Sequence, residues 1–357
     1  MNKDSKIYIA GNHGLVGSAI WKSLQKKGFV NLIGRSHEEL DLLDSVAVSE
    51  FFEKEKPEYV YLAAAYVGGI MANNIYRADF IYRNLQIQNN IIYESFKHNV
   101  KKLLFLGSTC VYPREAPQPI SEDFLLTSPL EYTNEPYAIA KIAGLKMCES
   151  FNIQYGTNFI AVMPTNLYGP NDNFDLEKSH VLPAMIRKIH LGKCLKENNW
   201  DSIRKDLNKR PVENVSGKNS IEEIISMLKR YGVSANKIEL WGTGKPMREF
   251  LWSEDMADAC IYIMNNVDFS DLSKDKTEIR NCHINIGTGK EISIRDLSQL
   301  IKQTVGYTGD ITFDPSKPDG TMRKLTDVSK LNSLGWQHQI EIEEGIRRMY
   351  DWYTSKV

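Results

Sequence analysis

The chain has 357 residues, of which 42% are hydrophobic and 25% are charged, and its formal net charge is -1. This composition is typical of a globular protein with two lobes, and the balanced charge gives no reason to expect nucleic-acid or membrane partners. No stretch approaches the roughly 18 apolar residues of a membrane span. The N-terminus runs directly into a strand pattern, and the five cysteines are scattered without metal-knuckle spacing. We therefore expect no signal peptide and no metal site, and a location in a reducing cytoplasm.

The first half of the chain alternates short apolar runs with longer helical patterns. This alternation predicts an α/β fold of the Rossmann type, a doubly wound parallel sheet covered on both faces. The predicted strands are residues 7–10, 31–34, 59–63, 103–106 and 159–162. Long helices are expected over about 81–98 and about 136–155, and each could serve as a dimer face or simply cover the sheet.

A glycine-rich turn follows the first predicted strand. Gly11, Gly14 and Gly17 form a GxxGxxG loop between that strand and a helix. The first glycine permits a tight turn, the second lets backbone approach a pyrophosphate, and the third lets the helix pack on the strand. The helix N-terminus adds N–H groups and a partial positive charge for phosphates. The loop therefore predicts a dinucleotide cofactor.

The end of the second predicted strand bears on which dinucleotide binds. NAD enzymes usually carry an acidic residue there, which holds the ribose 2′-hydroxyl. This chain instead has Gly34-Arg35-Ser36-His37, and Arg35 would suit a 2′-phosphate. Asp41 and Leu42 follow, where the adenine would lie. We favour NADPH and do not exclude NADH, while a solvated surface charge is the alternative interpretation of Arg35.

Three residues form a candidate catalytic set. Tyr137 and Lys141 are spaced as YxxxK in a predicted helix, and Ser108 ends the fourth predicted strand. Residues four apart share a helix face, so the Lys141 cation is expected to lower the Tyr137 pKa towards working pH. Tyr137 would then act as general acid on a carbonyl oxygen that receives a hydride, and Ser108 would donate a hydrogen bond to the same oxygen.

Two further residues would extend this chemistry. Cys110 lies two residues after Ser108, and His180 lies in the second half of the chain. A thiolate and an imidazole could epimerise the centres beside a sugar carbonyl, because groups that polarise the carbonyl also stabilise the enolate. Taken singly, Cys110 is more simply a buried small residue, and His180 a structural hydrogen bonder.

The second half predicts a smaller C-terminal lobe. We expect an NAD(P)-binding domain over 1–165, to which segments near 250–265 and 281–295 return, and a mainly substrate-binding lobe over 166–357. A polar inserted segment, about 196–237, falls in this lobe. Within it, Ser220 and Glu223 are spaced as a capping box, which predicts a short helix that ends before Gly232.

Five motifs resemble the GDP-L-fucose synthase family of the extended short-chain dehydrogenases/reductases. They are 63–70 (AAAYVGGI), 134–144 (NEPYAIAKIAG), 163–170 (MPTNLYGP), 246–251 (PMREFL) and 316–320 (SKPDG). The resemblance covers nearly the whole chain apart from about 196–237. It implies an NADPH-dependent 3,5-epimerase and 4-reductase that acts on GDP-4-keto-6-deoxy-mannose as a homodimer.

The resemblance also implies residue roles. Ser108, Tyr137 and Lys141 match the reductase set, with Cys110 as epimerase base and His180 as its acid. The implied cofactor-binding residues are Gly11, His13, Gly14, Leu15, Val16, Gly17, Arg35, His37, Asp41, Leu42, Ala63, Ala65, Leu106, Lys141, Pro164, Asn166, Leu167 and His180. The implied substrate-binding residues are Ser108, Asn166, Lys188, Trp241, Arg248 and Asp319. Plain core packing is the alternative for Trp241.

Three departures from the family pattern keep alternatives open. Arginine is usual at the positions of His13 and His37. Histidine there weakens the binding of NADPH at neutral pH, so NADH is not excluded as the cofactor. Thr109 stands where serine is usual, and the insertion could reshape the sugar pocket. One alternative is a C4-reductase without epimerase activity on a GDP-4-keto-6-deoxy-heptose, and another is a nucleotide-sugar 4-epimerase. The absence of an acidic pair after Ser108 argues against a dehydratase, and the intact catalytic set argues against a non-catalytic sensor.

Overall fold

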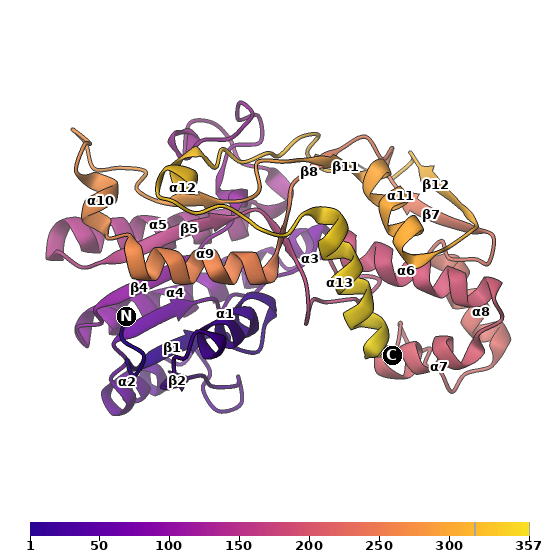
Figure 1. Ribbon diagram of the computed structural model, residues 1–357, viewed down its shortest axis with the longest axis horizontal. Helices are drawn as coiled ribbons and strands as arrows, with labels where there is room; N and C mark the ends of the chain where they lie inside the picture. The colour runs from indigo at the N-terminus through magenta and orange to yellow at the C-terminus, as the bar shows by residue number, and fades with distance from the viewer. Residues whose placement is uncertain (318, 357) are drawn as a thin grey trace. The chain divides into compact units, whose positions relative to one another are not determined.

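Figure 1 shows the computed structural model of the chain, which describes residues 1–317 and 319–356. Pro318, in the predicted 316–320 motif, lies outside the described residues. The chain forms two compact units. The first comprises Met1–Leu167, Glu249–Lys290 and Leu325–Gln339, and the second comprises Tyr168–Arg248, Glu291–Lys324 and 340–356. That one unit binds the cofactor and the other the substrate stays a prediction.

A parallel six-stranded sheet forms the centre of the first unit. Its strands are β1 (Ile7–Ala10), β2 (Leu32–Ile33), β3 (Tyr59–Leu62), β4 (Lys102–Leu106), β5 (Phe159–Pro164) and β10 (Ile284–Ile286). Their order across the sheet is β10-β5-β4-β3-β1-β2, and every neighbouring pair is parallel. This order confirms the predicted Rossmann-type α/β fold. Strand β2 is only two residues long, shorter than the pattern at 31–34 predicts.

Helices cover both faces of this sheet because side chains alternate along each strand. Tyr8 and Ala10 belong to one apolar cluster, which also contains residues of α2 (Ser45–Glu55), α4 (Arg77–Lys97) and α5 (Glu135–Tyr155). Ile7 and Ile9 belong to the cluster on the other face, with residues of α1 (Leu15–Lys26) and α9 (Ser253–Asn266). Figure 1 shows α1 and α9 side by side along the sheet. With both faces covered, ligands are expected beyond the carboxyl ends of the strands.

Shorter elements complete the first unit. They are α3 (Ile70–Ile75), α10 (Phe269–Ser273), α12 (Ser329–Ser333) and the 3₁₀ turns η1 (Thr109–Val111), η2 (Glu122–Phe124) and η3 (Tyr132–Asn134). Strand β6 (Asn166–Tyr168), within which the first unit ends, pairs with β9 (Phe250–Trp252).

The second unit is mainly helical. Its helices are α6 (Val181–Lys196), α7 (Trp200–Lys209), α8 (Ile221–Arg230), α11 (Ile294–Val305) and α13 (Ile342–Ser355). Strand β7 (Lys237–Trp241) lies parallel to β12 (Asp310–Asp314), and β8 (Met247–Arg248) lies antiparallel to β11 (Ile292–Ser293). Helix α6 packs against α7, α11 and β7.

The inserted segment 196–237 is folded and carries α7 and α8. The predicted capping box is confirmed, because Ser220 Oγ accepts a hydrogen bond from Glu223 N and Glu223 Oε2 accepts one from Ser220 N. A buried ion pair joins the insertion to α6, where Arg187 Nη2 lies 2.8 Å from Asp206 Oδ2. Both side chains are fully buried.

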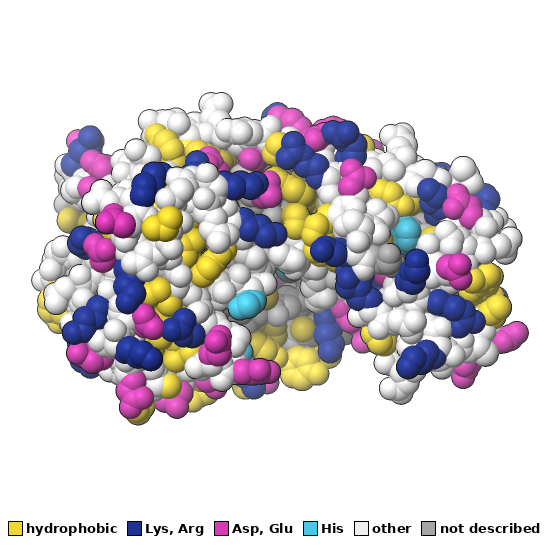
Figure 2. Space-filling view, turned by 60° about the horizontal axis from the view of Figure 1, so that its bottom comes forward, with side chains coloured by type: hydrophobic (Ala, Val, Ile, Leu, Met, Phe, Trp, Pro, Cys, Tyr) yellow, Lys and Arg dark blue, Asp and Glu magenta, His cyan; other side chains and the backbone are white. Residues whose placement is uncertain are grey.

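The surface charge, the hydropathy of the helices and the placement of metal-binding side chains each test an expectation about binding partners. Figure 2 shows a face on which Lys and Arg side chains are interspersed with Asp and Glu side chains, in keeping with the net charge of -1. Among the described residues, no helix combines the length and hydropathy that crossing a membrane requires. Within the same ranges, no group of three or more His, Cys, Asp or Glu side chains is placed to hold a metal ion.

Candidate active site

The glycine loop joins β1 to α1 with a conformation that requires glycine. Gly11 has a φ of +84°, and a Cβ there would lie 2.8 Å from Ala64 N. A Cβ on Gly17 would lie 2.1 Å from Gly11 O. At Gly14 the nearest atom to a Cβ is 3.5 Å away, and no side chain caps α1 there. The first N–H groups of α1, from Leu15 onward, thus have no side-chain cap, as is expected of a helix N-terminus that binds a pyrophosphate.

Arg35 lies directly after β2 and is held in place. Its Nη2 donates a 2.7 Å hydrogen bond to Glu55 Oε1, and its Nη1 donates one of 2.8 Å to Gly34 O. A Cβ on Gly34 would lie 2.4 Å from the Asn12 side chain, so a larger residue here would displace that side chain. The guanidinium is therefore positioned by a carboxylate rather than free in solvent.

His13, which follows β1, and His37, which follows β2, are both exposed. His37 Nδ1 lies 3.7 Å from Asp41 Oδ1. Hydrogen bonds from Ser36 lower the pKa of Glu39, and the charges of Arg35 and His13 lower it further. Arg35 and His13 thus share one electrostatic neighbourhood, which is the region predicted to hold a 2′-phosphate.

The other predicted cofactor residues of the first unit follow strand ends or lie within them. Ala63 and Ala65 follow β3, Leu106 ends β4, and Pro164 ends β5. Leu42 packs against the apolar cluster beneath α2 and α4. Because the strands are parallel, their carboxyl ends meet at one edge of the sheet.

The candidate catalytic set comes together at that edge. Ser108 follows Gly107, whose absent Cβ lets the turn pack on Met163 of β5. A hydrogen bond links the side chains of Ser108 and Tyr137. Lys141 Nζ lies 5.8 Å from the Tyr137 ring centroid and donates a 2.9 Å hydrogen bond to Leu106 O.

Burial dominates the electrostatics of this set. Burial lowers the pKa of Lys141 to about 7. Desolvation of its hydroxyl raises the pKa of Tyr137 above its ordinary value, and the hydrogen bond from Ser108 opposes this. The Tyr137 pKa is raised rather than lowered towards working pH, because desolvation of the buried hydroxyl is the largest influence on it. A tyrosine that keeps its proton is nevertheless suited to act as an acid.

Cys110 lies on the same turn, with a partner that the sequence did not reveal. Its Sγ accepts a 3.3 Å hydrogen bond from Asn134 Nδ2, and its N donates one of 3.2 Å to Ser108 Oγ. Asn134 precedes α5, the helix that carries Tyr137. The sequence pointed to Asn134 only through its place in the motif 134–144. Its contact with Cys110 could not be predicted, because it depends on how η1 packs against α5.

Asn166 and Leu167 lie in β6 at the end of a first-unit segment, whereas the remaining predicted residues lie in the second unit. His180 is exposed and precedes α6, and Lys188 lies on α6 with a pKa lowered by burial to about 8. Trp241 ends β7 with 60% of its side chain exposed, and Lys317 Nζ lies 5.7 Å from its ring centroid. An exposed tryptophan is not core packing, so that alternative is wrong.

Arg248 and Asp319 also interact within this unit. Burial lowers the pKa of Arg248, and the charge of Asp319 opposes this. Asp319 accepts hydrogen bonds from Thr243 N at 2.8 Å and Thr243 Oγ1 at 2.6 Å, which lower its pKa. Four polar or aromatic substrate candidates are thus present on one unit.

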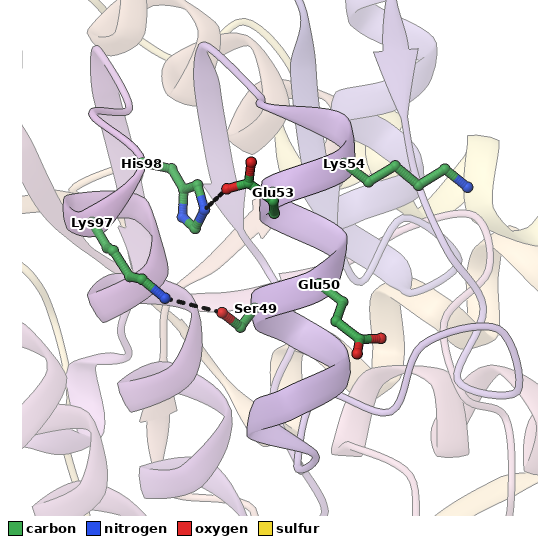
Figure 3. Close-up of a pocket in the computed structure, with 6 residues that line it drawn as sticks. All are labelled: Ser49, Glu50, Glu53, Lys54, Lys97 and His98. Carbon is green, nitrogen blue, oxygen red and sulfur yellow. Dashed lines mark hydrogen bonds and ion pairs between the residues drawn. The ribbon is translucent and has the colours of Figure 1, made fainter.

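A separate surface hollow lies away from these groups. Figure 3 shows it between α2 and the C-terminal end of α4, lined by Ser49, Glu50, Glu53, Lys54, Lys97 and His98. Its contacts are surface pairs, such as His98 Nε2 to Glu53 Oε2 at 3.2 Å. This end of α4 leads into the start of β4, whereas the catalytic set follows the carboxyl ends of the strands. The hollow is therefore not part of the candidate active site.

Comparison with known proteins places these features in a family. Residues 7–287 match the NAD dependent epimerase/dehydratase family. GDP-L-fucose synthase 1 from Arabidopsis thaliana is 49% identical, over 100% of this chain and 95% of its own length.

Two solved structures from Campylobacter jejuni are also similar. A GDP-D-glycero-L-gluco-heptose synthase in the presence of NADPH is 50% identical with a TM-score of 0.92, covering 99% of each chain. A GDP-mannoheptose C4 reductase with NADP bound is 49% identical with a TM-score of 0.87, again covering 99% of each chain. The glycine loop, the YxxxK pair and the full-length similarity together show that the chain belongs to the NAD dependent epimerase/dehydratase family and, within it, to the GDP-L-fucose synthase family.

Proposed function

We propose that this chain reduces the 4-keto group of a GDP-4-keto-6-deoxy sugar with NADPH. The observation that carries the proposal is the meeting of Ser108, Tyr137 and Lys141 at the carboxyl edge of the sheet. The relatives named as a GDP-L-fucose synthase, a GDP-heptose synthase and a GDP-mannoheptose C4 reductase support the substrate class. The neighbours solved in the presence of NADPH and with NADP bound support the cofactor. The uncapped N-terminus of α1 and the held Arg35 fit such a cofactor.

The chain's residues divide the work of reduction. NADPH supplies the hydride when it is bound. Tyr137, which keeps its proton because its pKa is raised, donates that proton to the carbonyl oxygen. Ser108 donates a hydrogen bond to the same oxygen and stabilises its developing negative charge. Lys141, in its protonated form, stabilises the tyrosinate that remains.

Epimerisation at carbons 3 and 5 is the second part of the proposal. Cys110 lies on the same turn as Ser108, so a thiolate there would face a carbonyl already polarised by Ser108 and Tyr137. His180 would supply the acid. The neighbour named as a C4 reductase supports the alternative, in which the chain only reduces a GDP-4-keto-heptose.

One experiment separates these outcomes. The chain is mixed with GDP-4-keto-6-deoxy-mannose and NADPH in deuterium oxide, NADPH absorbance is followed, and the product is analysed by NMR. NADPH consumption with deuterium at carbons 3 and 5 supports the bifunctional reaction. Consumption without deuterium supports a pure reductase, and the heptose analogue is then tested. Absence of NADPH consumption with either sugar contradicts the proposal.

We also infer that the chain acts as a homodimer in a reducing cytoplasm. Apolar side chains are exposed on α4 (Tyr82, 65%, and Tyr93, 52%) and on α5 (Ile153, 54%, and Tyr155, 52%). Paired helices with such side chains are typical of an isologous interface. No disulfide joins any of the five cysteines within the described chain, as a reducing compartment favours. Sedimentation at micromolar concentration tests the dimer, and a monomer would contradict it.

A further inference from the structure

Glu249 is a buried carboxylate that belongs to none of the predicted roles. It lies between β8 and β9, and its side chain is fully buried. Its Oε1 accepts hydrogen bonds from Thr288 N at 2.6 Å and Gly289 N at 2.8 Å. Its Oε2 accepts one from Thr326 N at 3.0 Å and a second from Thr326 Oγ1. Within the described chain its donors are neutral backbone and hydroxyl groups, so the carboxylate gathers backbone segments rather than pairing with a lysine or arginine.

The segments it joins lie beside three of the five points at which the chain passes between the two units. These three passages fall at Arg248–Glu249, Lys290–Glu291 and Lys324–Leu325. Thr288, Gly289 and Thr326 all lie within two residues of a passage, on its first-unit side. The fit is tight, because a Cβ on Gly287 would lie 2.2 Å from Glu249 Oε1. One side chain therefore joins three backbone segments of the first unit, each next to a passage.

The backbone carbonyl of Glu249 holds Asn166, a residue predicted to bind the cofactor and the substrate. Glu249 O accepts a 2.8 Å hydrogen bond from Asn166 Nδ2 and a 3.4 Å hydrogen bond from Thr165 Oγ1. Asn166 begins β6 and is predicted to contact both cofactor and substrate. One N–H of the Asn166 amide is thus engaged by Glu249 O, which leaves Oδ1 and the second N–H for a ligand.

We propose that Glu249 is a positioning residue of the reductase, which acts through Asn166. The carboxylate fixes the backbone at Glu249, and the carbonyl of that backbone fixes the Asn166 amide. This inference rests on the proposed function, since it assigns the Asn166 amide to the ligand site of that reaction. It needs no contact between Glu249 and any ligand.

The test begins with Glu249→Gln, which keeps the size of the side chain. One oxygen becomes an amide NH₂, so either the Thr288 and Gly289 N–H groups or the Thr326 N–H loses its acceptor. Displacement of the Asn166 amide is expected to lower kcat by about tenfold to a hundredfold. The KM for NADPH is expected to change by less than about threefold, since the glycine loop is untouched. A merely structural role would lower the unfolding midpoint and leave kcat per folded molecule unchanged, which would overturn the proposal.

A double-mutant comparison then asks whether the effect passes through Asn166. Asn166→Ala and Glu249→Gln are measured singly and together. If Glu249 acts through Asn166, the double variant has the kcat of Asn166→Ala alone. Independent effects, which multiply in the double variant, would contradict the proposal. Glu94→Gln on α4 is the matched control, because Glu94 is a buried carboxylate of the same unit that contacts Ser49 and His98.

Two additions keep the test decisive. If Glu249→Gln does not fold, Thr326→Val removes one hydrogen bond to the carboxylate while keeping the side-chain shape, and Thr326→Ser restores the hydroxyl. The Val variant is expected to lower kcat and the Ser variant to retain it, and equal values in the two would overturn the proposal. The fluorescence emission of bound NADPH is measured without any sugar. This measurement therefore tests the positioning role even if the chain does not catalyse the proposed reaction. It is expected to change alike in Glu249→Gln and Asn166→Ala, and an unchanged spectrum in Glu249→Gln would contradict the positioning role.

Discussion

The buried Lys141 ammonium donates a 2.9 Å hydrogen bond to Leu106 O, which ties helix α5 to the carboxyl end of β4. Only 3% of this lysine is exposed, and burial lowers its pKa to about 7. The unfolded chain keeps lysine protonated to about pH 10.4, so the unfolded state binds the extra proton between about pH 7 and pH 10. Lys141 therefore makes the stability of the fold rise with pH across that window.

Lys141→Met is expected to remove this pH dependence. The difference in unfolding free energy between the native chain and the variant should grow by up to a few kcal/mol from pH 6 to pH 10, in favour of the native chain. Urea denaturation at several pH values measures it. Lys22→Met, at an exposed lysine of α1, is the control and should show no such trend. A constant difference across the range would mean that Lys141 stays protonated in the folded chain.

Tyr137→Phe is expected to remove the proton donor and keep the packing. The ring contacts Phe80 edge-on with centroids 6.3 Å apart, and phenylalanine preserves that contact. Loss of general acid catalysis should lower kcat by about 10²- to 10⁴-fold, with an unfolding midpoint close to that of the native chain. Ser108→Ala is expected to lower kcat by a smaller factor of about 10². Equal activity of Tyr137→Phe and the native chain would exclude Tyr137 as the acid.

Much of the fold and of this catalytic set could be predicted because both depend on the spacing of residues that are close together in the sequence. Apolar runs give the strands, and the four-residue spacing of Tyr137 and Lys141 places both on one helix face. The pKa of Lys141 could not be predicted, because burial is a property of the packed chain. Asn134 and Cys110 are 24 residues apart, and Glu249 and Thr326 are 77 apart. Such contacts depend on tertiary structure and have no local signature.

Arg35→Ala is expected to distinguish the two nicotinamide cofactors. The guanidinium is held by Glu55 at the end of β2, where a ribose 2′-phosphate would bind. Its loss should raise the KM for NADPH by about tenfold and leave the KM for NADH unchanged, since a charge-assisted hydrogen bond is worth roughly 1.5–3 kcal/mol. Glu55→Gln should shift the NADPH value in the same direction by less. An equal effect on both cofactors would place Arg35 outside the 2′-phosphate site.

Cys110→Ala is expected to separate epimerisation from reduction. In deuterium oxide, the product should lack deuterium at carbons 3 and 5, because the thiolate that removes those protons is gone. Reduction of a substrate that is already epimerised should persist within about tenfold, since Ser108, Tyr137 and Lys141 remain. Cys148→Ala, at a buried cysteine of α5, is the control and should leave the labelling unchanged. Deuterium at both carbons in the Cys110 variant would assign the base to another residue.

Asp206→Ala is expected to destabilise the second unit through the insertion. Arg187 donates to Asp206 from Nε at 2.9 Å, and Tyr353 OH donates to the other carboxylate oxygen at 2.6 Å. Removing the carboxylate leaves a fully buried guanidinium unpaired, which should cost about 3–5 kcal/mol in unfolding free energy. Asp201→Ala, at an exposed position of the same helix, should cost less than about 0.5 kcal/mol. The pair Arg187→Met with Asp206→Leu removes both charges and should recover most of the loss. A loss of the same size in the double variant would show that the hydrogen bonds from Tyr353 and to Phe174 and Arg210, rather than the unpaired charge, set the stability.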